Sequence, residues 1–119
     1  MLNKRVAIYI PGTTGVKMPA SELQGKMVNH ALTIFSNRFG GATAIDAKGA
    51  WVSQKHGLVV EPVVLVYAFT DNKGVENNVH AIKAFAGYVA KQMSQECVAV
   101  ELCDELQFVS PAETLAEAA

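Results

Sequence analysis

Apolar and polar residues alternate along this chain in patterns that predict five strands and two helices. Short apolar runs and period-two alternation predict strands at residues 6–10, 42–52, 58–69, 97–102 and 106–109. Apolar residues at three- and four-residue steps predict one helix from Ser21 to Phe39 and another from Asp71 or Asn72 to Met93. The elements therefore follow the order β-α-β-β-α-β, with one extra short strand at the end.

A few residues indicate where these elements begin, end or bend. Ser21 and Gln24 have the spacing of a capping box at the start of the first helix. The Gly40-Gly41 pair is expected to end that helix. Gly49, inside the second strand, predicts a β-bulge at that position.

The predicted fold class is α+β. Short connections and right-handed crossovers arrange this element order as a ferredoxin-like split βαβ fold, in which an antiparallel sheet is backed by both helices. A polar turn at residues 54–57 joins the second and third strands as a β-hairpin. Residues 1–110 are expected to form this single domain, and residues 111–119 a flexible acidic tail. Since both helices cover the same face, the other face must be polar or must contact another molecule.

The third strand, "LVVEPVVLVYAF", is apolar on both of its faces. One face holds Val59, Glu61, Val63, Leu65, Tyr67 and Phe69, and the other holds Leu58, Val60, Val64, Val66 and Ala68. The helices can cover only one of them, so the second predicts a partner surface, most commonly another copy of the chain. Pro62 cannot donate a hydrogen bond to the sheet, so it marks a bulge or the point where the strand leaves its neighbour. Glu61 is then expected beside a break in the sheet, near an interface.

Composition and charge argue against several classes of function. The 119-residue chain has 50% hydrophobic and 18% charged residues, as globular proteins do, and a net charge of -1. No cluster of Lys and Arg stands out, so binding to nucleic acid or to an anionic membrane is not indicated. The apolar runs are too short for a signal peptide or a membrane helix, and a cytoplasmic protein is expected. Cys97 and Cys103 lack metal-ligand spacing, which predicts reduced thiols, and neither a metal nor a cofactor is expected.

Two carboxylates stand within apolar strands and are the first candidates for chemistry. They are Glu61 in "VVEPV" and Glu101 in "VAVEL". Charged groups in such surroundings concentrate at functional sites, although each of these two can also be a strand-end residue that reaches water or a lysine. The split βαβ order places them toward opposite ends of one sheet. We therefore expect them to meet only across a subunit interface.

Aromatic and hydroxyl side chains are weaker candidates. Trp51, Tyr67 and Tyr9 lie on predicted strands, and an aromatic face beside a carboxylate suits a cation with a flat base attached. Ordinary core packing is the alternative explanation for these rings. Thr13 and Thr14, in the "PGTTGV" loop, can offer hydroxyls to an anion, but the loop lacks the lysine and spacing of a phosphate-binding loop.

The segments "RFGGATAIDAKGAWVSQKHGLVVEPVVLVYAFTD" and "SQECVAVEL" resemble a family of phage-encoded enzymes that degrade S-adenosylmethionine, the SAM lyases, formerly called SAM hydrolases. The resemblance covers roughly residues 6–102. It implies a PII-like trimer of ferredoxin-like subunits in the cytoplasm of a bacterial host, with the active site between subunits. It also implies cleavage of S-adenosylmethionine to methylthioadenosine and homoserine lactone without metal or cofactor, by attack of the substrate's own carboxylate.

The resemblance also assigns roles to the candidate residues. Glu61 and Glu101 match the acidic site positions of the family, where one carboxylate would hold the substrate cation and the other would fix its reactive conformer. Tyr67 and Trp51 would flank the adenine or the interface. The loop that holds Thr13 and Thr14 would close over the substrate.

Two other functions fit the same residues. One is a PII-like trimeric sensor that binds a nucleotide without turning it over. ATP would need basic residues in the cleft, and neither "LVVEPVVLVYAF" nor "CVAVEL" contains Lys or Arg. These two strands therefore favour a cationic ligand over ATP. The other is a phage or plasmid interaction protein that binds a host partner through its apolar sheet face.

Overall fold

A computed structural model describes residues 2–14 and 20–111 of the chain, and all structural statements below concern these residues. The strands are β1 (Lys4–Pro11), β2 (Thr43–Ser53), β3 (Gly57–Thr70), β4 (Val98–Leu102) and β5 (Glu105–Val109), and the helices are α1 (Ser21–Phe39) and α2 (Asn72–Gln92). Each predicted element is present at nearly the predicted position. The loop predicted to close over a substrate is residues 11–16 and the predicted tail is residues 111–119; of these, residues 15–16 and 112–119 lie outside the described residues.

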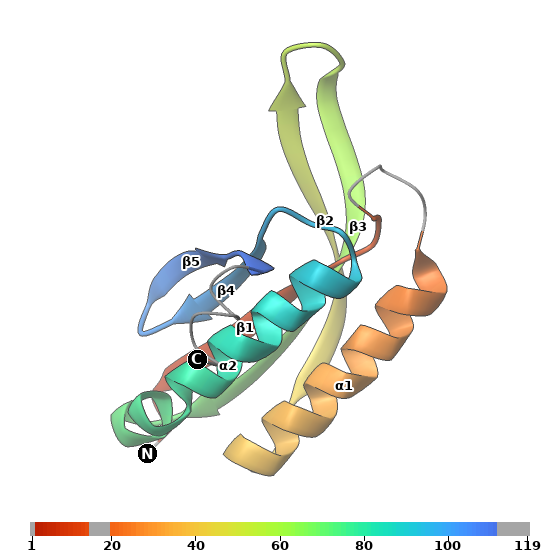
Figure 1. Ribbon diagram of the computed structural model, residues 1–119. Coiled ribbons are helices and arrows are strands. Elements are labelled where there is room, and N and C mark those ends of the chain that lie inside the picture. The colour runs from red at the N-terminus through yellow and green to blue at the C-terminus, as the bar shows by residue number, and fades with distance from the viewer. Residues whose placement is uncertain (1, 15–19, 112–119) are drawn as a thin grey trace.

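The five strands form one antiparallel sheet in the order β2-β3-β1-β4-β5. Both helices lie on one face of this sheet, α1 against β3 and β1 and α2 against β4, β1 and β5 (Figure 1). This arrangement confirms the predicted α+β, ferredoxin-like fold. Neither α1 nor α2, the two helices of the described residues, lies on the opposite face of the sheet.

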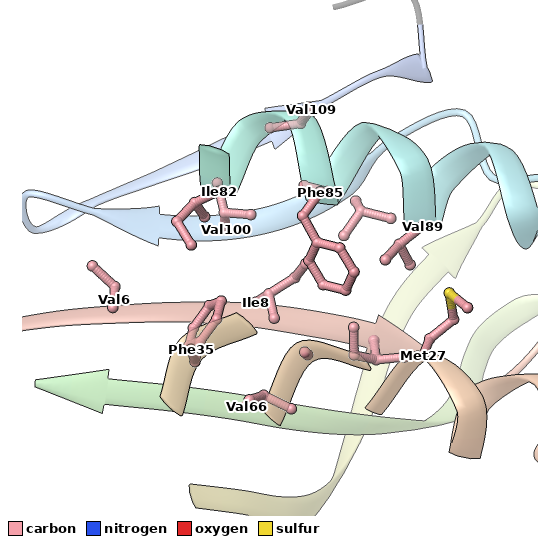
Figure 2. Close-up of a cluster of buried hydrophobic side chains, with 14 of the residues drawn as sticks. Val6, Ile8, Met27, Phe35, Val66, Ile82, Phe85, Val89, Val100 and Val109 are labelled. Atoms are coloured by element: carbon pink, nitrogen blue, oxygen red, sulfur yellow. The ribbon is translucent and has the colours of Figure 1, made fainter. Parts of the chain in front are cut away.

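The hydrophobic core fills the space between the helices and the sheet (Figure 2). Its largest fully buried side chains include Ile8, Val66 and Val100 from the sheet and Phe35 and Ile82 from the helices. Their positions follow from period two along the strands and period 3.6 along the helices. The core therefore fixes which residues point away from the helices, onto the uncovered face.

The β2–β3 hairpin extends beyond the ends of the helices (Figure 1). Its register runs without an extra residue from the pair Thr43 and Tyr67 to the pair Ser53 and Gly57, so the predicted bulge at Gly49 was wrong. A Cβ atom at Gly49 would lie 3.1 Å from Cγ2 of Val63 on the neighbouring strand. This close packing explains why a residue without a side chain stands at position 49.

Pro62 marks the point where β3 leaves β1, which was one of its two predicted roles. The β1–β3 ladder ends at the pair Pro11 and Val63, whereas β3 continues past Pro62 paired only with β2. At this point Gly12 packs against Pro62 so closely that a Cβ atom would lie 2.5 Å from the Pro62 carbonyl oxygen. A larger residue at position 12 would push the end of β1 away from β3.

The helix ends follow the sequence signals in part. Asp71, one of the two residues predicted near the start of α2, caps this helix, since its carboxylate accepts a hydrogen bond of 2.8 Å from the backbone N–H of Gly74. Gly40 ends α1 in the left-handed conformation, with φ of 89°. The capping box predicted for α1 was wrong, because the N-cap is Ala20 and the amide of Gln24 donates instead to the carbonyl of Ile10, at 3.2 Å. That bond ties α1 to the end of β1.

Two helical glycines should respond in opposite directions to alanine. A Cβ atom at Gly74 would collide with Oγ1 of Thr70, whereas one at Gly25 would meet nothing within 4 Å. Gly25→Ala should raise the free energy of unfolding by about 0.5–1 kcal/mol, because alanine restricts the unfolded chain. Gly74→Ala should lower it by about 1–3 kcal/mol through steric strain. Urea denaturation of both variants measures the difference, and equal stabilisation by the two would contradict the close contact at Gly74.

Candidate functional site

The uncovered face of the sheet is largely apolar and exposed. Residues paired across antiparallel strands share a face, so the odd-numbered residues of β1, β2 and β3 lie together here. The large apolar side chains exposed on this face are Ile45, Trp51, Phe69, Leu106 and Phe108, with 46% to 63% of their surface accessible. An apolar surface of this kind on a folded protein marks a place of contact with another molecule.

A small hollow on this face contains the first candidate carboxylate. Its walls include Tyr9, Glu61, Gln95, Cys97 and Phe108, and its volume is about 170 Å³. Pockets that enclose a whole nucleoside-sized ligand are larger, roughly 300–1,000 Å³. The hollow of a single chain is therefore large enough for only part of such a ligand.

Glu61 is held by the segment that follows β1. The hydroxyl of Thr13 donates a hydrogen bond to Oε2 of Glu61 at 3.1 Å, and the amide of Gln95 donates to the backbone carbonyl of Thr13 at 2.7 Å. Thr13 therefore orients this carboxylate. The hydroxyl of Thr14 is buried and has no hydrogen-bond partner among the described residues.

The second carboxylate, Glu101, has a different environment. Its Oε1 accepts a hydrogen bond from the hydroxyl of Tyr9 at 2.5 Å and one from Nη2 of Arg5 at 3.2 Å. The Arg5 guanidinium also lies over the ring of Tyr67, 5.0 Å from its centroid, in a cation–π contact. Glu101 is thus paired with a cation from β1. This partner was not predicted, because the two apolar strands that hold Glu61 and Glu101 contain no Lys or Arg.

The hydroxyl of Tyr9 remains a proton donor at neutral pH. The pKa of Tyr9 is raised above its ordinary value by the hydrogen bond to Glu101, by burial and by the negative charge of that carboxylate. The nearby Arg5 offsets part of this increase. Donation from Tyr9 to Glu101 is therefore a stable feature of the site.

The candidate residues fall into separate groups within one chain. Glu101 is paired with Ala7, whereas Glu61 lies beyond Val63, the last partner of β1, so the backbone positions of these two residues are offset by about 20 Å along the strands of the same face. Trp51 is paired with Val59 in the projecting hairpin, about 26 Å along β3 from Tyr67. A single chain therefore brings Thr13 to Glu61 and Tyr67 to the neighbourhood of Glu101, but does not bring Trp51 to Tyr67.

Several residues of these groups escaped the sequence analysis. Arg5 stands before the first apolar run and Gln95 lies in the turn after α2, so neither composition nor periodicity singled them out. Cys97 was named in the sequence analysis only as a reduced thiol. Only the strand register reveals Arg5, because it places this residue diagonally across from Glu101.

The described residues contain no group of three or more His, Cys, Asp or Glu side chains arranged to hold a metal ion. Cys97 and Cys103 are both exposed and are not joined in a disulfide. No helix in the described part of the chain is long and apolar enough to cross a membrane.

Comparison with solved structures relates the fold to a known enzyme. A phage SAM lyase in complex with S-methyl-5'-thioadenosine superposes with a TM-score of 0.63 at 17% sequence identity, covering 92% of this chain and 93% of the other. A phage SAM lyase without ligand gives the same TM-score at 18% identity, covering 92% and 90%. The fold is that of phage SAM lyase. At this level of identity the likeness shows the fold alone. No family model and no curated protein sequence matches the chain.

Proposed function

We propose that this protein is a SAM lyase, which cleaves S-adenosylmethionine to methylthioadenosine and homoserine lactone. The observation that carries the proposal is the place of Glu61, a carboxylate in a hollow on the uncovered apolar face of a fold shared with a phage SAM lyase. A carboxylate in apolar surroundings suits a cationic substrate, and S-adenosylmethionine carries both a sulfonium and an ammonium group.

The proposed reaction needs no nucleophile from the protein. An oxygen of the substrate's carboxylate forms a bond to the γ-carbon of the amino-acid chain, which is one of the three carbons attached to the sulfonium. The carbon–sulfur bond breaks, and its electron pair stays on sulfur. The negative charge of the carboxylate and the positive charge of the sulfonium cancel during this step, so weakly solvating apolar surroundings favour it. Holding the chain of the substrate in the reactive conformer can lower the barrier by up to roughly 7–11 kcal/mol.

This change in charge assigns a role to Glu61. A carboxylate beside the sulfonium would stabilise the substrate more than the transition state, because the sulfonium charge disappears as the bond breaks. The ammonium keeps its charge throughout the reaction. We therefore propose that Glu61, oriented by Thr13, binds the ammonium, and that Glu101 fixes the reactive conformer.

The proposed active site lies between subunits of a homotrimer. Three observations support a shared site: the hollow of about 170 Å³ is too small for the whole substrate, the backbone positions of Glu61 and Glu101 are offset by about 20 Å along the strands of one chain, and the sheet face around them is apolar and uncovered. Trp51 of one subunit and Tyr67 of another would then flank the adenine. Thr14, three residues past the end of β1, would lie near the substrate.

The proposed function is tested by incubating the purified chain with S-adenosylmethionine and separating the products by chromatography with mass detection. Formation of methylthioadenosine above a protein-free control supports a SAM lyase. Binding of S-adenosylmethionine without turnover would instead support a sensor. A folded protein that neither binds nor cleaves the substrate would exclude both.

The two cysteines offer a built-in probe of the hollow. Cys97 lines it, whereas Cys103 lies in the turn between β4 and β5, and both thiols are exposed. S-methyl-5'-thioadenosine at about ten times its Kd should slow alkylation of Cys97 about tenfold, because bound ligand covers the thiol. The rate at Cys103 should stay unchanged. Peptide mass spectrometry after timed alkylation measures both rates in one sample, and equal rates at Cys97 with and without ligand would place the ligand elsewhere.

A further inference from the structure

We infer that Arg5 and Tyr9 are positioning residues, which hold the Glu101 carboxylate in one orientation and leave its Oε2 for the substrate. This inference rests on the proposed function. It adds Arg5 to the candidate residues of the sequence and gives Tyr9, named there only as an aromatic candidate, a specific role.

The geometry for this role is specific. The hydroxyl of Tyr9 and Nη2 of Arg5 both donate to the same oxygen, Oε1 of Glu101. Oε2 accepts no hydrogen bond from the described residues. A glutamate side chain loses considerable rotamer freedom when it is ordered, and β4, which carries Glu101, is only five residues long. The two hydrogen bonds from Arg5 and Tyr9 to Oε1 therefore hold the Glu101 side chain in one orientation, which the short strand β4 does not do by itself.

The donors are themselves held in place. The guanidinium of Arg5 lies on the ring of Tyr67, and this ring meets Phe69 edge-on with centroids 6.0 Å apart. The resulting row of side chains crosses from β3 over β1 to β4 on the uncovered face. The Arg5–Glu101 pair is only partly buried, and an ion pair that water still reaches contributes little to stability by itself. The arrangement of Arg5, Tyr67 and Glu101 is therefore better explained by orientation of the carboxylate.

Tyr9 also connects the two parts of the face. Its side chain lines the hollow that contains Glu61, and its hydroxyl donates to Glu101. The proposed cleavage transfers no proton, so the hydroxyl of Tyr9 needs no acid–base role. Its function is then to donate the hydrogen bond to Glu101. Removal of the hydroxyl alone should therefore act on the reaction through Glu101.

A double-mutant cycle tests this dependence. Tyr9→Phe should lower kcat/KM for methylthioadenosine formation by about 10- to 100-fold, the range expected for a lost hydrogen bond to a charged group. The loss should fall mainly on kcat, since a misoriented carboxylate affects the reactive conformer more than substrate capture. In a Glu101→Gln background, measured by single turnover, Tyr9→Phe should cause no further loss. Tyr88→Phe, on α2 and away from the site, should behave as wild type.

Arg5 is tested by conservative replacement. Arg5→Gln should lower kcat as Tyr9→Phe does, and Arg5→Lys should recover part of the loss because it restores a cationic donor. A merely structural pair would instead lower the melting temperature and leave kcat and KM of the folded protein unchanged. Full activity in Tyr9→Phe, or equal losses with and without Glu101, would overturn the inference while the proposed function stands. A folded wild-type chain that neither cleaves S-adenosylmethionine nor binds S-methyl-5'-thioadenosine would overturn the proposed function, and the inference with it.

Discussion

Glu61→Gln should lower kcat/KM for S-adenosylmethionine cleavage by about 100-fold or more while leaving the protein folded, since truncating one partner of a desolvated charge pair typically has an effect of this size. The glutamine keeps the shape of the side chain and an oxygen that can accept the hydrogen bond from Thr13. Only the negative charge that would bind the substrate ammonium is lost. The effect is therefore expected in catalysis and not in stability.

Product formation and thermal denaturation, measured on the same preparation, separate these two effects. Glu76→Gln is a matched control, because it makes the same replacement at an exposed position on α2. Full activity of the Glu61→Gln protein would show that Glu61 lies outside the active site. A Glu61→Gln protein that unfolds would show that the negative charge of Glu61 serves the fold.

Mixing the inactive variants Glu61→Gln and Glu101→Gln should restore activity if each site draws its two carboxylates from neighbouring subunits. The backbone offset of about 20 Å between Glu61 and Glu101 along the strands of one chain motivates this expectation. In a cyclic assembly with random exchange, a site is intact when one neighbour supplies Glu61 and the other supplies Glu101, which occurs at about a quarter of the sites. Activity should therefore rise from near zero to about 25% of the wild-type value.

This experiment requires partial unfolding and refolding of the mixture, with light scattering to verify that the assembly has the mass of a trimer. Each variant refolded alone is the control. Absence of activity in the mixture as well as in each refolded variant, with wild-type protein regaining full activity under the same treatment, would show that the two carboxylates act within one chain.

Much of the fold was predictable because it depends on local patterns. Period-two alternation, helical spacing and the Asp71 cap place the elements, and the missing N–H of Pro62 marks the end of the β1–β3 ladder. The errors came from residues whose local pattern has a second explanation. Gly49 is small because Val63 packs beside it, and Gln24 reaches the end of β1 in place of its own helix N-terminus.

The candidate site was predictable only where a residue contrasts with its neighbours in sequence. Glu61 and Glu101 stand out as charges within apolar strands, and the structure places both on the uncovered face. Arg5 and Tyr9 do not stand out in this way, because their relation to Glu101 depends on the register between β1 and β4. Contacts between strands distant in sequence are set by the whole sheet, and one strand's composition does not reveal them.

The most direct test of the central claim is cleavage of S-adenosylmethionine in water enriched with oxygen-18. Intramolecular attack predicts methylthioadenosine together with unlabelled homoserine lactone at early times, and any later label only in the carboxylate, where water opens the lactone. Label in the side-chain hydroxyl of homoserine would mean that water attacks the carbon beside the sulfonium, which contradicts a lyase. Absence of methylthioadenosine, with the protein shown to be folded, would contradict the proposed function as a whole.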